Sequence, residues 1–202
     1  MGLFSRNVTP TLDAIRFDTT GYRSLGEPRP GIRAWHTPDG DGVGLYMFTL
    51  PPDLPRVDSI AGIRAHYDGQ LAKAGGKLVA VTLPVAAGMP VVQVLSKTPQ
   101  QPSGFTYVGA ITFAFRDFSF VLKIQAEEKG PTGMREAILL DQRLAAGDTI
   151  DAARAYDTDA VDLDDSFPAH PISRARRVLA HLCRSVETDR AISSAPRFPL
   201  PR

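Results

Sequence analysis

The chain is short of the features that mark several large classes of protein. It has one cysteine, Cys183, among 202 residues, so no disulfide can form within it. No apolar run approaches the length of about 18 residues that a membrane-spanning helix needs. Residues 1–7 lack the apolar stretch of a signal peptide. We therefore expect a cytoplasmic protein that has no membrane partner.

The chain also has no excess of charge of either sign. Its 23 Lys and Arg residues nearly balance its 22 Asp and Glu residues, which leaves a net charge of +1. This balance provides no overall field that would attract nucleic acid. A surface for single-stranded nucleic acid would need exposed aromatic rings among Lys or Arg side chains. Thr, Ala and Ser separate the rings of the Phe-rich strands described below, so we predict no nucleic-acid partner.

The residue patterns of common catalytic and metal sites are missing as well. There is no Gly-x-Ser-x-Gly motif, and the run Gly40–Gly44 lies between two predicted strands, whereas a phosphate loop precedes a helix. The Asp-rich stretch fails the EF-hand pattern, since Val161 takes the fifth position counted from Asp157. No zinc-ligand spacing relates the histidines, which are His36, His66, His170 and His181. We predict no catalytic, cofactor-binding or metal-binding residues.

The clearest pattern that is present runs from Phe105 to Gly147. Five of the ten Phe residues lie between Phe105 and Phe120. They alternate with small or polar residues, and a period of two is typical of strands. We therefore predict strands at 105–115 and 118–127, with the Phe side chains on one face of a sheet.

A helix follows these two strands. The spacing predicts it at 134–146, with Thr132 as its N-cap and Gly147 after its end. Its apolar face contains Met134, Ala137, Ile138 and Leu144, with Leu139 or Leu140. A second amphipathic helix is predicted at 58–74. We expect these two helices to cover the Phe-bearing face of the sheet.

The remaining chain completes an α+β fold. The same periodicities and turn signals predict a strand at 14–17, a loop at 23–31, a hairpin at 32–50, strands at 77–83 and 89–95, and a helix at 173–188. We predict a mainly antiparallel sheet of about six strands with helices packed on it, an α/β/α sandwich. We divide the chain into a flexible N-terminus (1–12), a core (13–147), an acidic loop (148–172), a C-terminal helix of the same domain (173–190) and a disordered tail (191–202).

This order of elements resembles that of a known group of domains. A hairpin leads through Gly130-Pro131-Thr132-Gly133-Met134-Arg135-Glu136 into a helix, which is similar to Mog1/PsbP-like α/β/α sandwich domains over roughly residues 13–187. Members of that group are mostly non-enzymatic binding or assembly factors. The resemblance therefore implies a binding or assembly role here, and it carries no functional residue across.

Two clusters of opposite charge are the most suggestive surface features. Residues 148–165 hold seven Asp and one Arg. Three arginines, Arg174, Arg176 and Arg177, fall in the first turns of the last helix, where the helix dipole disfavours cations. We expect them to pair with the acidic stretch; alternatively, they receive an acidic partner or a phosphate. Trp35 is either a core residue or a contact anchor.

These features support a function in binding. Our first hypothesis is a non-catalytic protein that binds a protein partner or associates with itself to assemble a complex. The candidate interface residues are Trp35, Tyr46, Arg135, Arg174, Arg176, Arg177, Asp162, Asp164 and Asp165. The alternative is a small-ligand binder or an enzyme, with a pocket lined by Tyr46, Trp35 or Arg135. A third hypothesis gives the Asp cluster a cation.

Overall fold

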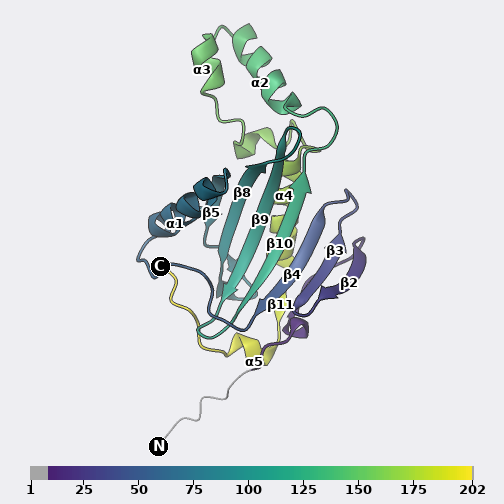
Figure 1. The fold of residues 1–202 in the computed structure, drawn as a ribbon, viewed down its shortest axis with the longest axis vertical. Coiled ribbons are helices and arrows are strands. Elements are labelled where there is room, and N and C mark those ends of the chain that lie inside the picture. The colour runs from purple at the N-terminus through teal and green to yellow at the C-terminus, as the bar shows by residue number, and fades with distance from the viewer. Residues whose placement is uncertain (1–8, 202) are drawn as a thin grey trace, which may run out of the picture.

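The centre of the molecule is an antiparallel sheet. The computed structural model describes residues 9–201. Its main sheet has seven strands in the order β2-β3-β4-β10-β9-β8-β5 (Figure 1). These strands are Arg23–Arg29 (β2), Ile32–His36 (β3), Gly42–Phe48 (β4), Lys77–Thr82 (β5), Val92–Pro99 (β8), Phe105–Ala114 (β9) and Ser119–Glu127 (β10). The predicted α+β class with an antiparallel sheet is confirmed.

Helices and short strands surround this sheet. The helices are Ile60–Lys73 (α1), Met134–Ala145 (α2), Ile150–Arg154 (α3), Pro171–Ser185 (α4) and Arg190–Ser193 (α5), with 3-10 turns at Leu12–Ala14 and Val161–Leu163. Two small ribbons pair Ile15–Arg16 (β1) with Glu187–Thr188 (β11), and Val85–Ala86 (β6) with Met89–Pro90 (β7). Among residues 9–201, no helix is both long enough and apolar enough to cross a membrane.

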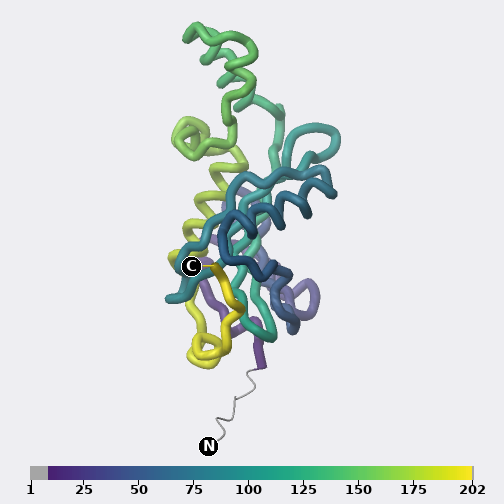
Figure 2. The backbone as a smooth tube through the Cα atoms, turned by 90° about the vertical axis from the view of Figure 1, so that its left-hand side faces the viewer, coloured from purple at the N-terminus to yellow at the C-terminus, as the bar shows by residue number. Residues whose placement is uncertain are grey.

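The sheet lies between two helices. In Figure 1, α4 runs behind the centre of the sheet, while α1 lies near β5, and Figure 2 shows the sheet from the side between them. The Phe-bearing face, with Phe113 and Phe120 fully buried, packs against α4. The other face forms a smaller core with Ile63 of α1. The layers are therefore helix, sheet and helix.

The expected cover of the Phe-bearing face was wrong. We predicted that the helices at 58–74 and 134–146 would cover it, but α4 does so through Ala175, Leu179 and Leu182, which are almost fully buried. Helix α1 packs on the opposite face, and α2 extends beyond one end of the sheet (Figure 1). Periodicity shows that a sheet face must be covered, but any amphipathic helix of the chain can supply the cover.

Two local predictions change, the loop at 23–31 and the N-cap of α2, whereas the cap of α1 is one of the two residues that its sequence allows. Residues 23–29, which we predicted as loop, form the exposed edge strand β2. Its pairing with β3 is irregular, and an edge strand tolerates the proline at position 28. The N-cap of α1 is Ser59, whose side chain accepts from Gly62 N–H at 3.3 Å. The N-cap of α2 is Gly133, at φ 74°, and not Thr132.

Both ends of the described chain pack on the core. The predicted flexible segment 1–12 falls partly outside the described residues, but Leu12 is buried in the main core. We predicted a disordered tail at 191–202, whereas most of α5 falls in this segment and Phe198 is buried in the smaller core. Phe198 N–H donates to the carbonyl oxygen of Ala114 at 3.1 Å. One buried ring and backbone pairing therefore hold a segment whose composition resembles a free tail.

Candidate functional site

Helices α2 and α3 form an arm, residues 134–154, that projects beyond one end of the sheet. Figures 1 and 2 both show the arm clear of the sheet layers. Within α2, Arg135 and Leu139 are the buried residues. The arm thus meets the rest of the protein along a narrow strip, and the opposite side of α2 faces outward.

The outward side of α2 is its apolar side. Met134 is 52% exposed, Ile138 38% and Leu144 39%. Helical geometry places these residues within about a third of the helix circumference, together with Ala137, Asp141 and Ala145, which are also exposed. The sequence identified this apolar face, but the expectation that it would pack on the sheet was wrong.

Arg135 fixes the inward side of α2. The side chain is 1% exposed, and its guanidinium donates to Ser173 Oγ at 3.2 Å and to the Ala160 carbonyl at 3.1 Å. A guanidinium nitrogen of Arg135 also lies 3.6 Å from an Asp164 carboxylate oxygen. The guanidinium carbon lies over the Phe167 ring, 5.4 Å from the ring centroid. Arg135 was a candidate interface residue, but here it is a buried anchor that offers no surface to a partner.

A second buried ion pair lies beside this anchor. Lys97 Nζ is 2.6 Å from an Asp159 carboxylate oxygen, with both side chains largely buried. The Tyr107 hydroxyl donates to the other Asp159 oxygen at 3.4 Å. Burial, followed by the charge of Asp159, raises the pKa of Tyr107, so the phenol stays protonated as a donor. The loop that carries Asp159 is thereby tied to β8 and β9.

The three arginines in the first turns of α4 pair within the chain. Arg176 lies 2.8 Å from Asp164, as the predicted pairing with the acidic stretch requires. Arg174 instead makes two contacts of 2.9 Å with Asp41, and the exposed Arg177 lies 3.7 Å from Asp39. Asp41 and Asp39, which lie between β3 and β4, are therefore the partners of Arg174 and Arg177.

The remaining candidate interface residues fall in different surroundings. Trp35 is buried, with its ring edge-to-face to Phe17 at 4.9 Å, so it is a core residue. Tyr46 is half-buried and stacks parallel to Phe48. Asp162 and Asp165 are exposed and make no ion pair with another described residue. The structure does not bring these residues together into one surface.

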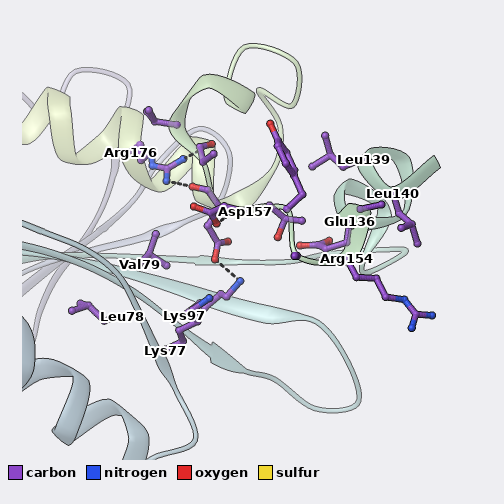
Figure 3. Close-up of a pocket in the computed structure, with 17 residues that line it drawn as sticks. Lys77, Leu78, Val79, Lys97, Glu136, Leu139, Leu140, Arg154, Asp157 and Arg176 are labelled. Carbon is purple, nitrogen blue, oxygen red and sulfur yellow. Dashed lines mark hydrogen bonds and ion pairs between the residues drawn. The ribbon is translucent and has the colours of Figure 1, made fainter. Parts of the chain in front are cut away.

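A cavity of about 760 Å³ lies between the arm and the sheet. Figure 3 shows side chains of both charges around it, among them Lys97, Glu136 and Arg176. Its size fits a small molecule, but sites for such ligands are mostly apolar. Lys97 and Arg176 are already paired with groups of the same loop, which reduces the number of free groups for a ligand.

Three potential metal ligands meet near the base of the arm. One ligand atom each from Glu128, Glu136 and His170 lies within 4.8 Å of the other two. Glu128 directly follows β10, Glu136 lies in the first turn of α2, and His170 is the N-cap of α4. Burial first, and then the charge of Arg135, lowers the pKa of His170 to about 4. Sequence reasoning missed this group because no local spacing links the three positions.

Comparisons with known proteins give a weak likeness of fold. No family model matches the chain, and no curated protein matches it. The matching solved structures include the solution structure of cyanobacterial PsbP (CyanoP) from Synechocystis sp. PCC 6803. That match has 10% sequence identity and a TM-score of 0.38, and it covers 72% of this chain and 88% of that one. PsbP belongs to the group that the element order resembles, but a likeness of this degree carries no functional argument.

Proposed function

We propose that the chain is a non-catalytic, cytoplasmic protein that binds a protein partner through the outward face of α2. One observation carries the proposal: the apolar side of an amphipathic helix faces solvent, while Arg135 on its other side is anchored in the protein. A surface helix of a monomeric protein ordinarily buries its apolar stripe. An exposed stripe on a projecting arm is the geometry of a helix that enters a groove of another protein.

The chemistry of the outward face indicates the kind of groove. Met134, Ile138 and Leu144 supply apolar contacts, and Asp141 lies among them. A complementary groove is apolar, with a Lys or Arg placed to meet Asp141. Burial of apolar surface stabilises by roughly 25 cal/mol per Å², so these side chains would dominate the affinity and the charge pair would fix the register.

A pair of matched isoleucines tests the proposal. Ile138 on α2 and Ile60 on α1 are 38% and 42% exposed, so Ile60→Glu is a control for Ile138→Glu. Affinity capture from the native cell, followed by light scattering of the purified complex, should give a defined complex with the wild type and with Ile60→Glu. The complex should be lost with Ile138→Glu. A wild type that remains a monomer without a partner would overturn the proposal, as would equal binding by both variants.

The cavity between arm and sheet supports a second candidate, the binding of a small charged molecule. Its volume of about 760 Å³ lies within the usual range for ligand sites. A thermal-shift screen of charged metabolites should then raise the unfolding midpoint of the wild type. The rise should be smaller for Lys77→Gln, because Lys77 lines the cavity. No shift across the screen would remove this candidate.

A further inference from the structure

Glu128, Glu136 and His170 form a mixed carboxylate and imidazole group where three elements meet. Their ligand atoms lie within 4.8 Å of one another, yet no hydrogen bond joins any two of them. Ligand atoms around a shared ion, each about 2.0–2.2 Å from the metal, lie at most about 4.4 Å apart. The three side chains are therefore close enough that small side-chain movements would bring their ligand atoms around one ion.

The two glutamate carboxylates lie close together, and a cation between them would reduce their mutual repulsion. Glu128 is only 9% exposed, and backbone N–H groups hold its oxygens, with Gly133 at 2.7 Å and Phe105 at 3.1 Å. Neither Glu128 nor Glu136 has an ion-pair partner within 4.0 Å among the described residues. Two close carboxylates repel each other unless a proton or a cation compensates them.

His170 provides the nitrogen. Its Nε2 atom is buried and has no hydrogen-bond partner among the described residues, and the ring packs edge-on against Tyr107 at 5.5 Å. Its Nδ1 atom lies 3.4 Å from Ile172 N–H, longer than the usual limit of about 3.2 Å. Coordination through Nε2 moves the ring proton to Nδ1 and gives up only this weak contact.

We propose that Glu128, Glu136 and His170 bind one divalent transition-metal ion of the zinc type. Imidazole nitrogen and carboxylate oxygen are ligands that such ions accept, whereas Mg²⁺ and Ca²⁺ favour oxygen alone. Three protein ligands leave a position for water. The ion would join the segment that follows β10, the first turn of α2 and the cap of α4, and so hold the arm at its base.

Cobalt absorption tests this site directly. The untagged full chain is titrated with Co²⁺, whose visible bands report coordination, and Zn²⁺ is then added as a competitor. Glu136→Gln removes one ligand at constant shape. His170→Asn removes the imidazole but keeps a side-chain acceptor at the N-cap. Each change should weaken binding by at least about tenfold, while the controls Asp162→Asn and His66→Asn should bind as the wild type does.

Three results would overturn the site. These are absence of Co²⁺ bands in the wild type, equal affinity in both ligand variants and the wild type, and Mg²⁺ binding as tight as Zn²⁺ binding. Far-ultraviolet circular dichroism shows whether each variant is folded, and two variants on different elements guard against a failure of one to fold. The site does not rest on the docking function of α2, since Ile138 takes no part in it.

Discussion

Arg135 is the buried charged side chain that connects the arm to the rest of the molecule. It is 1% exposed and contacts Ser173, Ala160 and Asp164, so its removal leaves buried polar groups without a partner. Breaking a buried charge pair costs about 3–5 kcal/mol. We expect Arg135→Ala to lower the free energy of unfolding by an amount near that range, measured by urea denaturation.

An exposed arginine of the same arm is the matched control. Arg154 lies on α3 and makes no ion pair with another described residue. Arg154→Ala should change the free energy of unfolding by no more than about 0.5 kcal/mol. Similar losses for Arg135→Ala and Arg154→Ala would show that Arg135 is not an anchor.

Alanine substitutions at two glycines should change the free energy of unfolding in opposite directions. A Cβ atom at Gly109 on β9 would lie 2.7 Å from side-chain atoms of Ile124 and Leu179, where α4 approaches the sheet. Gly109→Ala should therefore destabilise by about 1–3 kcal/mol. Gly69 of α1 has open space at that position, so Gly69→Ala should stabilise by about 0.5–1 kcal/mol. Urea denaturation of both variants measures the two signs, and a stabilised Gly109→Ala would contradict the close approach of α4.

At the scale of elements, the C-terminal segment behaves as part of the core. Phe198 is buried in the smaller core, which also contains Ile63 of α1, and Arg197 forms an isolated antiparallel β-bridge with Phe115. Replacing a buried Phe by Ala costs about 3–5 kcal/mol, so Phe198→Ala should lower the urea midpoint clearly. A segment that behaves as a free tail would give an unchanged midpoint and rapid proteolytic loss of residues 196–202.

The elements themselves could be predicted from local signals, but their partners could not. Alternation located β9 and β10, and the 3.6-residue period located α1, α2 and α4 within a few residues. The pattern of α2 showed an apolar side but not that Arg135, on the other side, would be the buried one. Likewise β2 lacked a strand pattern, because an edge strand exposed along its whole length needs no apolar alternation.

At the scale of the whole molecule, contacts between distant positions decide the site. Arg174 pairs with Asp41, 133 residues away in sequence, and Glu128 meets His170 only after β10 and α4 have packed together. Neither pair of residues forms a local sequence motif, because its members are far apart in the chain. The sequence therefore predicted no metal ligands. The charge clusters were visible, but only the fold determines which aspartate each arginine contacts.

The metal group and the outward face of α2 lie on opposite sides of one helix and should act independently. A ligand at 100 times its dissociation constant stabilises the folded state by about 2.7 kcal/mol. Zn²⁺ at that excess should raise the thermal midpoint equally for the wild type and for Ile138→Glu, because Ile138 is no ligand. The rise should be much smaller for Glu136→Gln at the same concentration. If Ile138→Glu removed the rise, the outward face and the arm base would be one coupled site, and metal would then control docking directly.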